Sequence, residues 1–340
     1  MSSFRRPKYL IMVLIAALVV CVGGYFGYEY YVSAKSTTTS ETRFYMDTFV
    51  TISATGANSS EIVEQAFNEI KRVEELFSRF LPASDVYKIN VNAGKWVGVS
   101  PEVIEVIEIG LKISGITNGA FDVTIGSLVT LWGFGTGDYR VPSEEELEQA
   151  LLKIDYNKIQ INKKTNEVFI PEGFVIDLGG VAKGYAVDRA TGVLKTNGIK
   201  HGMVNAGGDI VTIGPKVDGS LWRVGVQDPI NTTEILLVIP MKDSAIVTSG
   251  DYQRFFIEDN VRYHHIIDPR TGYPAKGLTS VTVVAPSATE ADLYSTAIFV
   301  LGLDKGKELV ESLKEIEAVI VDTNGQVWIS SGLIDSVYYL

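Results

Sequence analysis

The chain has 340 residues, of which 46% are hydrophobic and 11 are proline, enough apolar material for one large domain or two closely packed domains. This composition excludes an intrinsically disordered protein. The formal net charge is −11 and no block of Lys or Arg follows residue 8, which excludes the basic surface of a nucleic-acid-binding protein and favours a small-molecule substrate.

The amino terminus predicts a membrane anchor. Arg5, Arg6 and Lys8 precede an apolar run over residues 9–32, in which Glu29 is the single charged residue. About 20 helical residues cross the roughly 30 Å hydrocarbon core of a bilayer, and basic flanking residues stay on the cytoplasmic side. We expect a cytoplasmic segment 1–8, a transmembrane helix 9–32, a polar tether 33–42 and a catalytic domain 43–340 outside the cell membrane.

Two other processing routes remain open for this segment. The sequence Val32-Ser33-Ala34 suits signal-peptide cleavage, although the apolar run is longer than the usual ~7–15 residues of a signal peptide. Residues 18–21 resemble a lipobox, with bulky Val20 where a small residue normally precedes the lipidated cysteine. The hydrophobic length favours the uncleaved anchor. Cys21 is the single cysteine, so the exported domain contains no disulfide and no cysteine-based zinc site.

Beyond the tether, the first half of the domain is expected to be mainly helical. Residues 43–54 alternate and are rich in Thr, Phe, Tyr and Val, which predicts a strand. Ser59 or Ser60 is expected to cap the helix that follows. Two more helices are predicted to start at Ser100, which Pro follows directly, and at Ser143, which Glu follows three residues later.

Strands dominate the second half. Apolar segments predict strands at 159–161, 168–170, 203–205, 222–226, 236–239, 245–248 and 280–285, helices at 288–301 and 305–313, and strands at 318–321 and 327–330. Because strands and helices mix without regular βαβ alternation, we expect an α+β fold, with one compact mixed-sheet catalytic unit over residues 43–340.

The sequence DLGGVAKGYAVD at residues 177–188 is the first segment typical of a ligand site. It follows an apolar, strand-like segment and opens a helix that is expected to end at Asn197-Gly198. Backbone N–H groups converge where a glycine turn begins a helix, and the helix dipole favours an anion there. The segment matches neither a Walker loop nor the dinucleotide fingerprint, so an ordinary strand-to-helix turn remains the alternative.

Three more segments combine glycine, histidine or acidic residues. NAGGD at 205–209 is typical of a hairpin turn or of backbone that approaches a ligand closely. TSGDY at 248–252 precedes His264 and His265, and adjacent residues on a strand point to opposite faces. One of these histidines is therefore a candidate general base, whereas a shared zinc ion is excluded. Surface or core histidines on a strand are the alternative interpretation.

The last such segment is a predicted helix that contains Asp292, Ser295 and Thr296. The spacings i, i+3 and i+4 place these oxygen-bearing side chains on one helix face. A carboxylate together with hydroxyl groups suits Mg²⁺ or Ca²⁺ rather than zinc. A solvated helix face is the alternative interpretation.

Taken together, these segments resemble the FAD:protein FMN transferases, the ApbE family of flavin transferases. Nine segments between residue 44 and about residue 302 carry the resemblance, in order: 46–48, 78–80, 119–124, 131–134, 177–188, 205–209, 248–252, 264–272 and 291–296. The resemblance implies an α+β protein outside the cytoplasmic membrane that binds FAD and magnesium. It also implies transfer of FMN, through its phosphate, to a Thr or Ser of an exported target protein.

Site residues follow from the same resemblance, position by position. It implies that the flavin pocket is lined by Met46, Phe80, Ala120, Phe121 and Asp122, and that FAD also contacts Gly179, Tyr185 and Ile266. It implies a metal held by the backbone carbonyl of Ala182 with Asp292 and Thr296, and with Ser295 nearby.

For the chemistry we expect Mg²⁺ to neutralise the FAD pyrophosphate while the target hydroxyl attacks the FMN phosphorus and AMP leaves. His265 is the preferred general base, with Asp268 and Asp251 as candidates for orienting it. Two alternatives remain: a magnesium-dependent FAD pyrophosphatase that uses water, and an exported flavin-binding protein without turnover.

Overall fold

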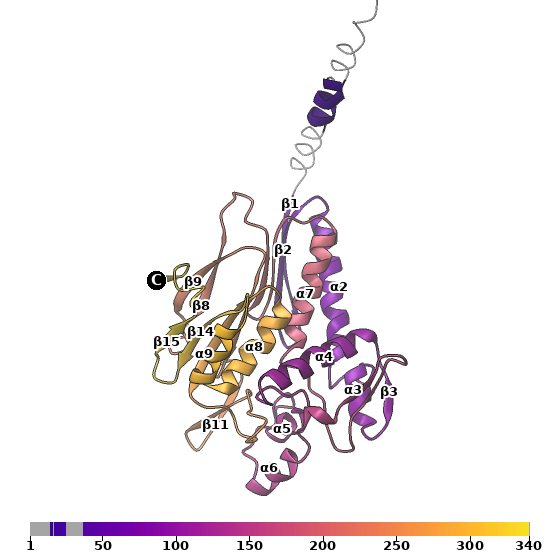
Figure 1. Ribbon diagram of the computed structural model, residues 1–340, viewed down its shortest axis with the longest axis vertical. Helices are drawn as coiled ribbons and strands as arrows, with labels where there is room; N and C mark the ends of the chain where they lie inside the picture. Colours follow the sequence, from indigo (N-terminus) through magenta and orange to yellow (C-terminus); the bar gives the residue numbers. More distant parts are fainter. Residues whose placement is uncertain (1–13, 16, 25–36, 340) are drawn as a thin grey trace, which may run out of the picture.

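The computed structural model describes residues 14–15, 17–24 and 37–339 (Figure 1). Residues 14–15 and 17–24 are helical. Within these described ranges, no helix has both the length and the apolar character that a membrane crossing needs. The predicted cytoplasmic segment 1–8, most of the predicted anchor 9–32 and residues 33–36 of the predicted tether lie outside the described residues.

The domain begins earlier than the sequence predicted, with a β-hairpin. Strand β1 (Thr37–Tyr45) pairs along its whole length with β2 (Thr48–Gly56), so residues 37–42 form an edge strand rather than a tether. The expected single strand over 43–54 is also wrong, because the chain reverses at Met46 and Asp47, whose φ angles are 52° and 58°. Polar Thr side chains concealed the strand in the sequence, although β-branched residues favour extended backbone.

An eight-stranded sheet forms the centre of the domain, in the order β1-β2-β6-β7-β10-β13-β14-β15. Its remaining strands are β6 (His201–Ala206), β7 (Asp209–Ile213), β10 (Ala245–Gly250), β13 (Leu278–Ala285), β14 (Glu317–Asp322) and β15 (Val327–Ile329). Every neighbouring pair in this sheet is antiparallel, so the expectation of a mixed sheet is wrong. The α+β class itself is confirmed.

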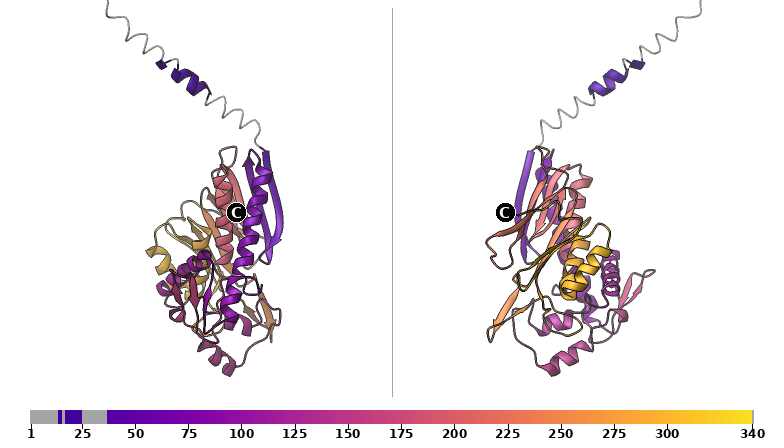
Figure 2. Two further views of the ribbon diagram at one scale, coloured as in Figure 1. Left: turned by 90° about the vertical axis from the view of Figure 1, so that its right-hand side faces the viewer. Right: turned by 60° about the vertical axis from the view of Figure 1, so that its left-hand side comes forward.

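Helices cover one face of this sheet and a smaller sheet covers the other (Figure 1). The covering helices are α2 (Ser59–Phe77), α7 (Ala182–Thr196), α8 (Ala288–Leu301) and α9 (Leu303–Ser312). On the other face, strands β8 (Trp222–Gln227), β9 (Ile235–Met241) and β16 (Tyr338–Tyr339) enclose a second apolar core that includes Val226, Ile239 and Val319. Helices α2 and α7 run side by side, as the left-hand view of Figure 2 shows.

Shorter elements lie between α2 and α7 in the chain. They are α3 (Asp85–Val91), α4 (Pro101–Ile116), α5 (Gly126–Leu131), α6 (Glu144–Leu151), the 3₁₀ helix η1 (Tyr156–Lys158) and a small sheet of β3 (Trp96–Gly98), β5 (Glu167–Phe169) and β4 (Gln160–Asn162). A separate hairpin of β11 (Phe255–Glu258) and β12 (Val261–His264) precedes β13. These segments carry most of the predicted site residues.

Two of the three predicted helix caps are confirmed. The Ser100 side chain accepts a hydrogen bond from the backbone at the start of α4, and Ser143 forms the expected capping box at the start of α6. At α2 the prediction of Ser59 or Ser60 is wrong, because Asn58 occupies the cap position without a side-chain hydrogen bond. The Ser59 hydroxyl instead hydrogen-bonds Thr37 and Thr39 of β1, which ties the helix to the edge of the sheet.

Helices α7 and α8 pack unusually closely at Gly184. A Cβ atom built at this position would lie 2.2 Å from the carbonyl oxygen of Ala288 and 2.9 Å from the Cβ of Asp292. One turn further along α7, the Asp188 carboxylate accepts hydrogen bonds at 2.8 Å from the backbone N–H groups of Ala288 and Thr289, and so caps the start of α8. The sequence of α7 therefore fixes the position of α8.

We expect Gly184→Ala to lower the free energy of unfolding by roughly 1–3 kcal/mol, because the added methyl group would collide with the backbone of α8 and overpack the contact between the two helices. Chemical denaturation measures this change. Gly192→Ala is the matched control in the same helix, since its Cβ would meet nothing within 4 Å, and it should stabilise the protein by roughly 0.5–1 kcal/mol. Equal effects of the two substitutions would contradict the close packing at Gly184.

Candidate active site

The strand register gathers three of the sequence motifs at one end of the eight-stranded sheet. The start of β2 pairs with the end of β6, so the β1–β2 turn lies beside the β6–β7 turn. The start of β7 also pairs antiparallel with β10, so the end of β10 reaches the same place. Residues 46–48, 205–209 and 248–252, which are distant in sequence, therefore meet at this end.

Four oxygen-bearing side chains form a buried group here, which we call the oxygen cluster: Asp292, Ser295 and Thr296 of α8, and Ser249 of β10. The Ser249 hydroxyl lies 2.8 Å from that of Ser295 and 3.4 Å from that of Thr296. Asp292 and Ser295 are 4% and 0% exposed. The i, i+3 and i+4 spacing thus places these side chains on the face of α8 that packs toward β10, and not on a solvated face.

The glycine-rich segment 177–188 runs directly over this cluster. Gly180 lies between the Phe121 ring and the Thr296 hydroxyl, at 3.0 Å and 3.7 Å from the Cβ position of a substituted residue. The backbone N–H of Gly184, in the first turn of α7, donates a hydrogen bond of 3.1 Å to Oδ2 of Asp292. Ala182 is the first residue of α7 and belongs to the same turn. The predicted metal ligands therefore come from two helices that touch one another.

These residues fit a magnesium ion better than a transition metal. Among the described residues, no group of three or more His, Cys, Asp and Glu side chains is placed to hold a metal ion. The oxygen cluster has one carboxylate, and the hydrogen bond to Asp292 from Gly184 uses one of its two oxygens. Mg²⁺ typically binds one or two carboxylates together with substrate phosphates and water, and such a site needs no all-protein cage. The donor set therefore suits Mg²⁺ that arrives with a pyrophosphate.

A buried ion pair beside the oxygen cluster was missed from the sequence. The Lys183 ammonium pairs with Asp209 at the start of β7, and the side chains are 30% and 2% exposed. Burial lowers the pKa of Lys183, but the carboxylates of Asp209 and Asp292 raise it by more, so the pKa is raised and the ammonium stays charged. The sequence pattern that could have indicated this pair is a lysine inside one glycine-rich segment and an acidic residue directly after Gly-Gly in another. Lys183 adds fixed positive charge to an otherwise acidic site.

Arg79 joins three of the loops at the site. Its Nε lies 3.0 Å from Oδ2 of Asp177, and both side chains are largely buried. Its other nitrogens donate to the Gly126 carbonyl, the Thr130 hydroxyl and the Phe134 carbonyl at 2.7–3.3 Å. The second Asp177 oxygen accepts the N–H of Gly179 at 2.7 Å. Arg79 therefore holds the glycine loop, α5 and the loop after α5 together.

The predicted flavin residues fall into two groups. Phe121, which follows Ala120, contacts Gly180, and Phe80 lies against Arg79. Met46 lies in the β1–β2 turn, where its backbone N–H donates to Glu74. Phe80 is 49% exposed, and its ring lies under the Arg79 guanidinium at 4.5 Å, so a flat apolar surface is available to a ligand. Gly179 is held by Asp177, and Ile266 is buried close to His265. Contact of these residues with flavin stays a prediction.

Asp122 and Tyr185 have structural partners. The Asp122 carboxylate accepts hydrogen bonds from the backbone and hydroxyl of Thr124, both at 2.7 Å, and from the backbone of Tyr156 at 3.1 Å. The Tyr185 hydroxyl donates to Glu102 at 3.1 Å. Burial raises the pKa of both Asp122 and Tyr185. These partners hold both side chains in place, and their contact with FAD stays a prediction.

The two adjacent histidines have different partners. His264 is buried, and its Nε2 lies 2.9 Å from the Ala275 carbonyl. In His265, Nδ1 lies 3.2 Å from the Arg254 carbonyl, which can only accept a hydrogen bond. Nδ1 therefore carries the proton and Nε2 has a free lone pair. Burial, and then the charge of Arg254, lowers the pKa of His265 to about 3, so the ring is neutral at physiological pH.

The predicted orienting carboxylates are engaged elsewhere. Asp268 forms a bidentate ion pair with Arg270 and also accepts the Arg270 backbone N–H. Asp251 lies 3.4 Å from Arg262. The partner of the His265 ring is the backbone carbonyl of Arg254, and the orienting role of Asp268 and Asp251 stays a prediction.

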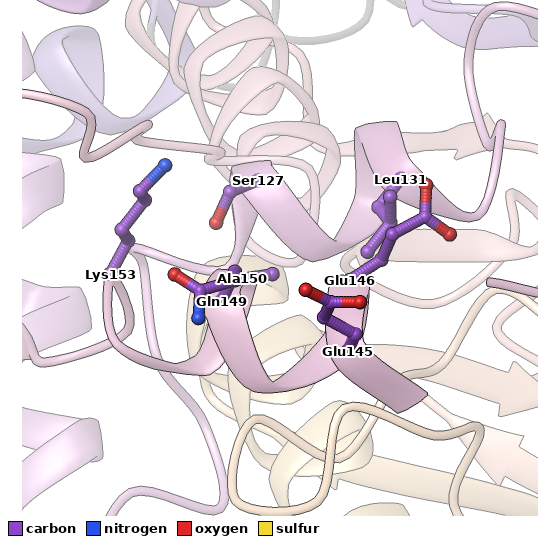
Figure 3. Close-up of a pocket in the computed structure, with 7 residues that line it drawn as sticks. All are labelled: Ser127, Leu131, Glu145, Glu146, Gln149, Ala150 and Lys153. Atoms are coloured by element: carbon purple, nitrogen blue, oxygen red, sulfur yellow. The ribbon is translucent and has the colours of Figure 1, made fainter. Parts of the chain in front are cut away.

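A surface hollow of about 410 Å³ lies outside this site (Figure 3). Residues of α5, α6 and the segment that follows line it: Ser127, Leu131, Glu145, Glu146, Gln149, Ala150 and Lys153. None of the predicted site residues is among them. The hollow is therefore separate from the residues that the motifs and the oxygen cluster bring together.

Comparisons with known proteins agree on one family. A model described as the ApbE family matches residues 46–320. The FAD:protein FMN transferase of Klebsiella pneumoniae is 32% identical, and the match covers 81% of this chain and 86% of that protein. The FAD:protein FMN transferase of Haemophilus influenzae is 34% identical, and the match covers 82% of this chain and 83% of that protein.

Solved structures show the same likeness. The ApbE protein of Thermotoga maritima superposes with a TM-score of 0.84 and is 38% identical, and the match covers 88% of this chain and 99% of that one. The flavin transferase ApbE of Vibrio cholerae superposes with a TM-score of 0.80 and is 30% identical, and the match covers 90% of this chain and 100% of that one.

We expect Arg79→Ala to lower the free energy of unfolding by about 3 kcal/mol or more, because it leaves the buried Asp177 without its cation. Chemical denaturation measures the loss. Arg140→Ala is the control, since it removes an equally close ion pair with Glu146 whose side chains are 47% and 41% exposed, and it should change stability much less. A similar loss in both variants would contradict the role of Arg79 in joining the loops.

Proposed function

We infer that this chain, which belongs to the ApbE family, is a flavin transferase that moves FMN from FAD to a target protein. One observation carries the inference from the structure. The hydrogen bond from Gly184 to Asp292 joins a glycine-rich loop, of the kind that receives phosphates, to a helix that presents oxygen ligands for a hard cation. A pyrophosphate and its cation are the ligands that need both.

We propose that Mg²⁺ binds Asp292, Thr296 and the backbone carbonyl of Ala182, with Ser295 nearby. When bound, the ion would neutralise the pyrophosphate and stabilise the departing AMP. The oxygen-only donor set at the α7–α8 contact supports this proposal. Lys183 contributes a permanent positive charge beside the carboxylates of Asp209 and Asp292.

We propose that His265 is the general base. Nε2 accepts the proton of the Thr or Ser hydroxyl, and the hydroxyl oxygen forms a bond to the FMN phosphorus. The bond between that phosphorus and the bridging oxygen breaks, and the bridging oxygen leaves on AMP. The free lone pair of Nε2 supports this role, because the Arg254 carbonyl fixes the proton on Nδ1. Arg79 and Asp177 hold the glycine loop in place during the reaction.

We also propose that the domain works outside the cytoplasmic membrane, on an exported acceptor, behind an anchor over residues 9–32. The basic residues before the apolar run and its length support this proposal. A cleaved signal peptide or a lipid on Cys21 would give the same location by another route.

Transfer and its metal dependence are measured together. Purified enzyme is incubated with FAD, Mg²⁺ and a flavin-free exported flavoprotein, and mass spectrometry detects FMN on a Thr or Ser. We expect EDTA to abolish the product, Mg²⁺ to restore it, and Asp292→Ala to reduce the rate at least 100-fold, because the pyrophosphate loses its cation site. Glu290→Ala, on the exposed face of the same helix, is the control.

Three results would contradict these proposals separately. Release of AMP from FAD without any mass shift on the acceptor identifies a pyrophosphatase instead of a transferase. Binding of FAD without AMP release identifies a flavin carrier. Full activity in EDTA rejects the magnesium site.

We expect His265→Ala to slow transfer by roughly 10²-fold at pH 7.5, the lower end of the contribution of a general base, because a ring with a lowered pKa is a weak base. Because the pKa of His265 is lowered to about 3, the base is deprotonated throughout pH 5–8, and its titration should produce no fall in the wild-type rate as pH decreases over that range. His201→Ala is the control, since its ring hydrogen-bonds the Pro215 carbonyl in another part of the domain. An unchanged rate in His265→Ala would reject the assignment.

A further inference from the structure

The β11–β12 hairpin is a two-stranded sheet of its own (Figure 1). One face of it packs on an aromatic group: Phe256 stacks with Tyr263 and with Tyr139, and both Phe256 and Tyr263 contact Trp132. The hairpin stands out from the body in the right-hand view of Figure 2. Its position is therefore fixed by one face, and the opposite face is left to the solvent.

The outer face of the hairpin is apolar. Phe255 and Ile257 of β11 are 37% and 63% exposed, and strand alternation places both on the face opposite to Phe256. Arg262 shares this outer face and lies over the Phe255 ring at 4.6 Å. Such a surface on an exposed hairpin favours contact with another molecule.

The outer edge of β11 also offers unpaired backbone groups. The N–H of His265 donates to the Arg254 carbonyl, so these two residues form a hydrogen-bonded pair. From this pair, non-hydrogen-bonded and hydrogen-bonded pairs alternate along the hairpin. The N–H and C=O groups of Phe255 and Ile257 consequently face away from β12, and among the described residues no strand pairs with this edge. In natural proteins, Lys, Pro or a bulge usually protects an edge strand from pairing with another chain, whereas this edge strand has the sequence Phe-Phe-Ile.

The base of the hairpin lies at the active site. Arg254 immediately precedes β11, and its carbonyl binds His265 through both the backbone N–H and the ring. Burial and then the charge of Arg254 lower the pKa of His265, and the same charge opposes the raised pKa of Lys183. At about 3.3 Å per residue, Ile257 is about three residues, or roughly 10 Å, from Arg254. A strand bound along the outer edge of β11 lies two strand spacings, roughly 10 Å, from the line of β12 and His265, so the residues that follow it past Arg254 can bring a hydroxyl across to His265.

We propose that β11 is the docking surface for the acceptor protein, whose flavinylated segment adds an extended strand to the free edge at Phe255 and Ile257. This proposal rests on the proposed transfer of FMN to a protein. The acceptor is the partner that must bring a hydroxyl within hydrogen-bonding distance of His265, and an extended segment is the form of polypeptide that an open strand edge recognises. Backbone hydrogen bonds hold the segment, and its apolar side chains rest on Phe255 and Ile257.

Two substitutions at Ile257 test the surface and the edge separately. Ile257→Glu removes the apolar contact and adds a charge. Ile257→Pro removes the outward N–H, and the pairing of β11 with β12 does not use that N–H. Val217→Glu is the matched control, because Val217 is 66% exposed in the segment between β7 and β8, away from the hairpin. The probe is the flavin-free acceptor protein that the wild-type enzyme flavinylates.

We expect both Ile257 variants to lower kcat/KM for the acceptor at least tenfold, mainly through KM. FAD affinity should stay at its wild-type value, because Ile257 lies on the outer face of the hairpin, away from the oxygen cluster. Val217→Glu should behave as wild type. Circular dichroism and thermal melting establish that each variant is folded, and Ile257→Glu decides the result if Ile257→Pro melts early.

Unchanged kcat/KM in Ile257→Glu overturns the docking surface while the transferase activity stands. A loss in Val217→Glu as large as that in Ile257→Glu also overturns it, since the effect would then not be local to the hairpin. Failure of the wild-type enzyme to flavinylate any acceptor removes the proposed function, and the docking surface with it.

Discussion

The site depends on the close contact of α7 with α8 at Gly184. Because glycine has no side chain there, the backbone of α7 reaches Asp292 directly and its N–H donates to the carboxylate. Asp188 then fixes the start of α8 from the same helix. One helix thus supplies the anion-binding turn and also places the oxygen ligands below it. A larger residue at 184 would push α7 away from α8 and weaken the hydrogen bond between Gly184 and Asp292.

Charge explains why the ligands are arranged in this way. An acidic protein that binds a dinucleotide must offset its own field locally. Lys183 does so with a fixed ammonium that is paired with buried Asp209 and lies close to Asp292. A divalent cation would complete the balance when the pyrophosphate arrives, which is consistent with a cluster that contains a single carboxylate of its own. Lys183 therefore offsets one of the two carboxylates beside it before the substrate binds.

The loops around this centre are tied together rather than left independent. Arg79 links the glycine loop to α5 through Asp177 and two backbone carbonyls, and the Arg254 carbonyl fixes His265 at the base of the β11–β12 hairpin. The same hairpin rests on the aromatic group around Trp132. Nucleotide and acceptor would thus be held by separate segments that meet at His265, which allows the acceptor surface to vary without disturbing the metal site.

The sequence by itself determined the α+β class, the helix caps at Ser100 and Ser143, the spacing that groups Asp292 with Thr296, and the family, because these depend on local periodicity or on residues within one segment. The tertiary structure alone decided which atoms meet. The Lys183–Asp209 pair, the place of Ser249 in the oxygen cluster, the contacts of Arg79 and the Arg254 carbonyl behind His265 all join segments 11 to 98 residues apart. The β1–β2 hairpin was missed for the same reason: its polar Thr strand is recognisable only by the partner with which it pairs.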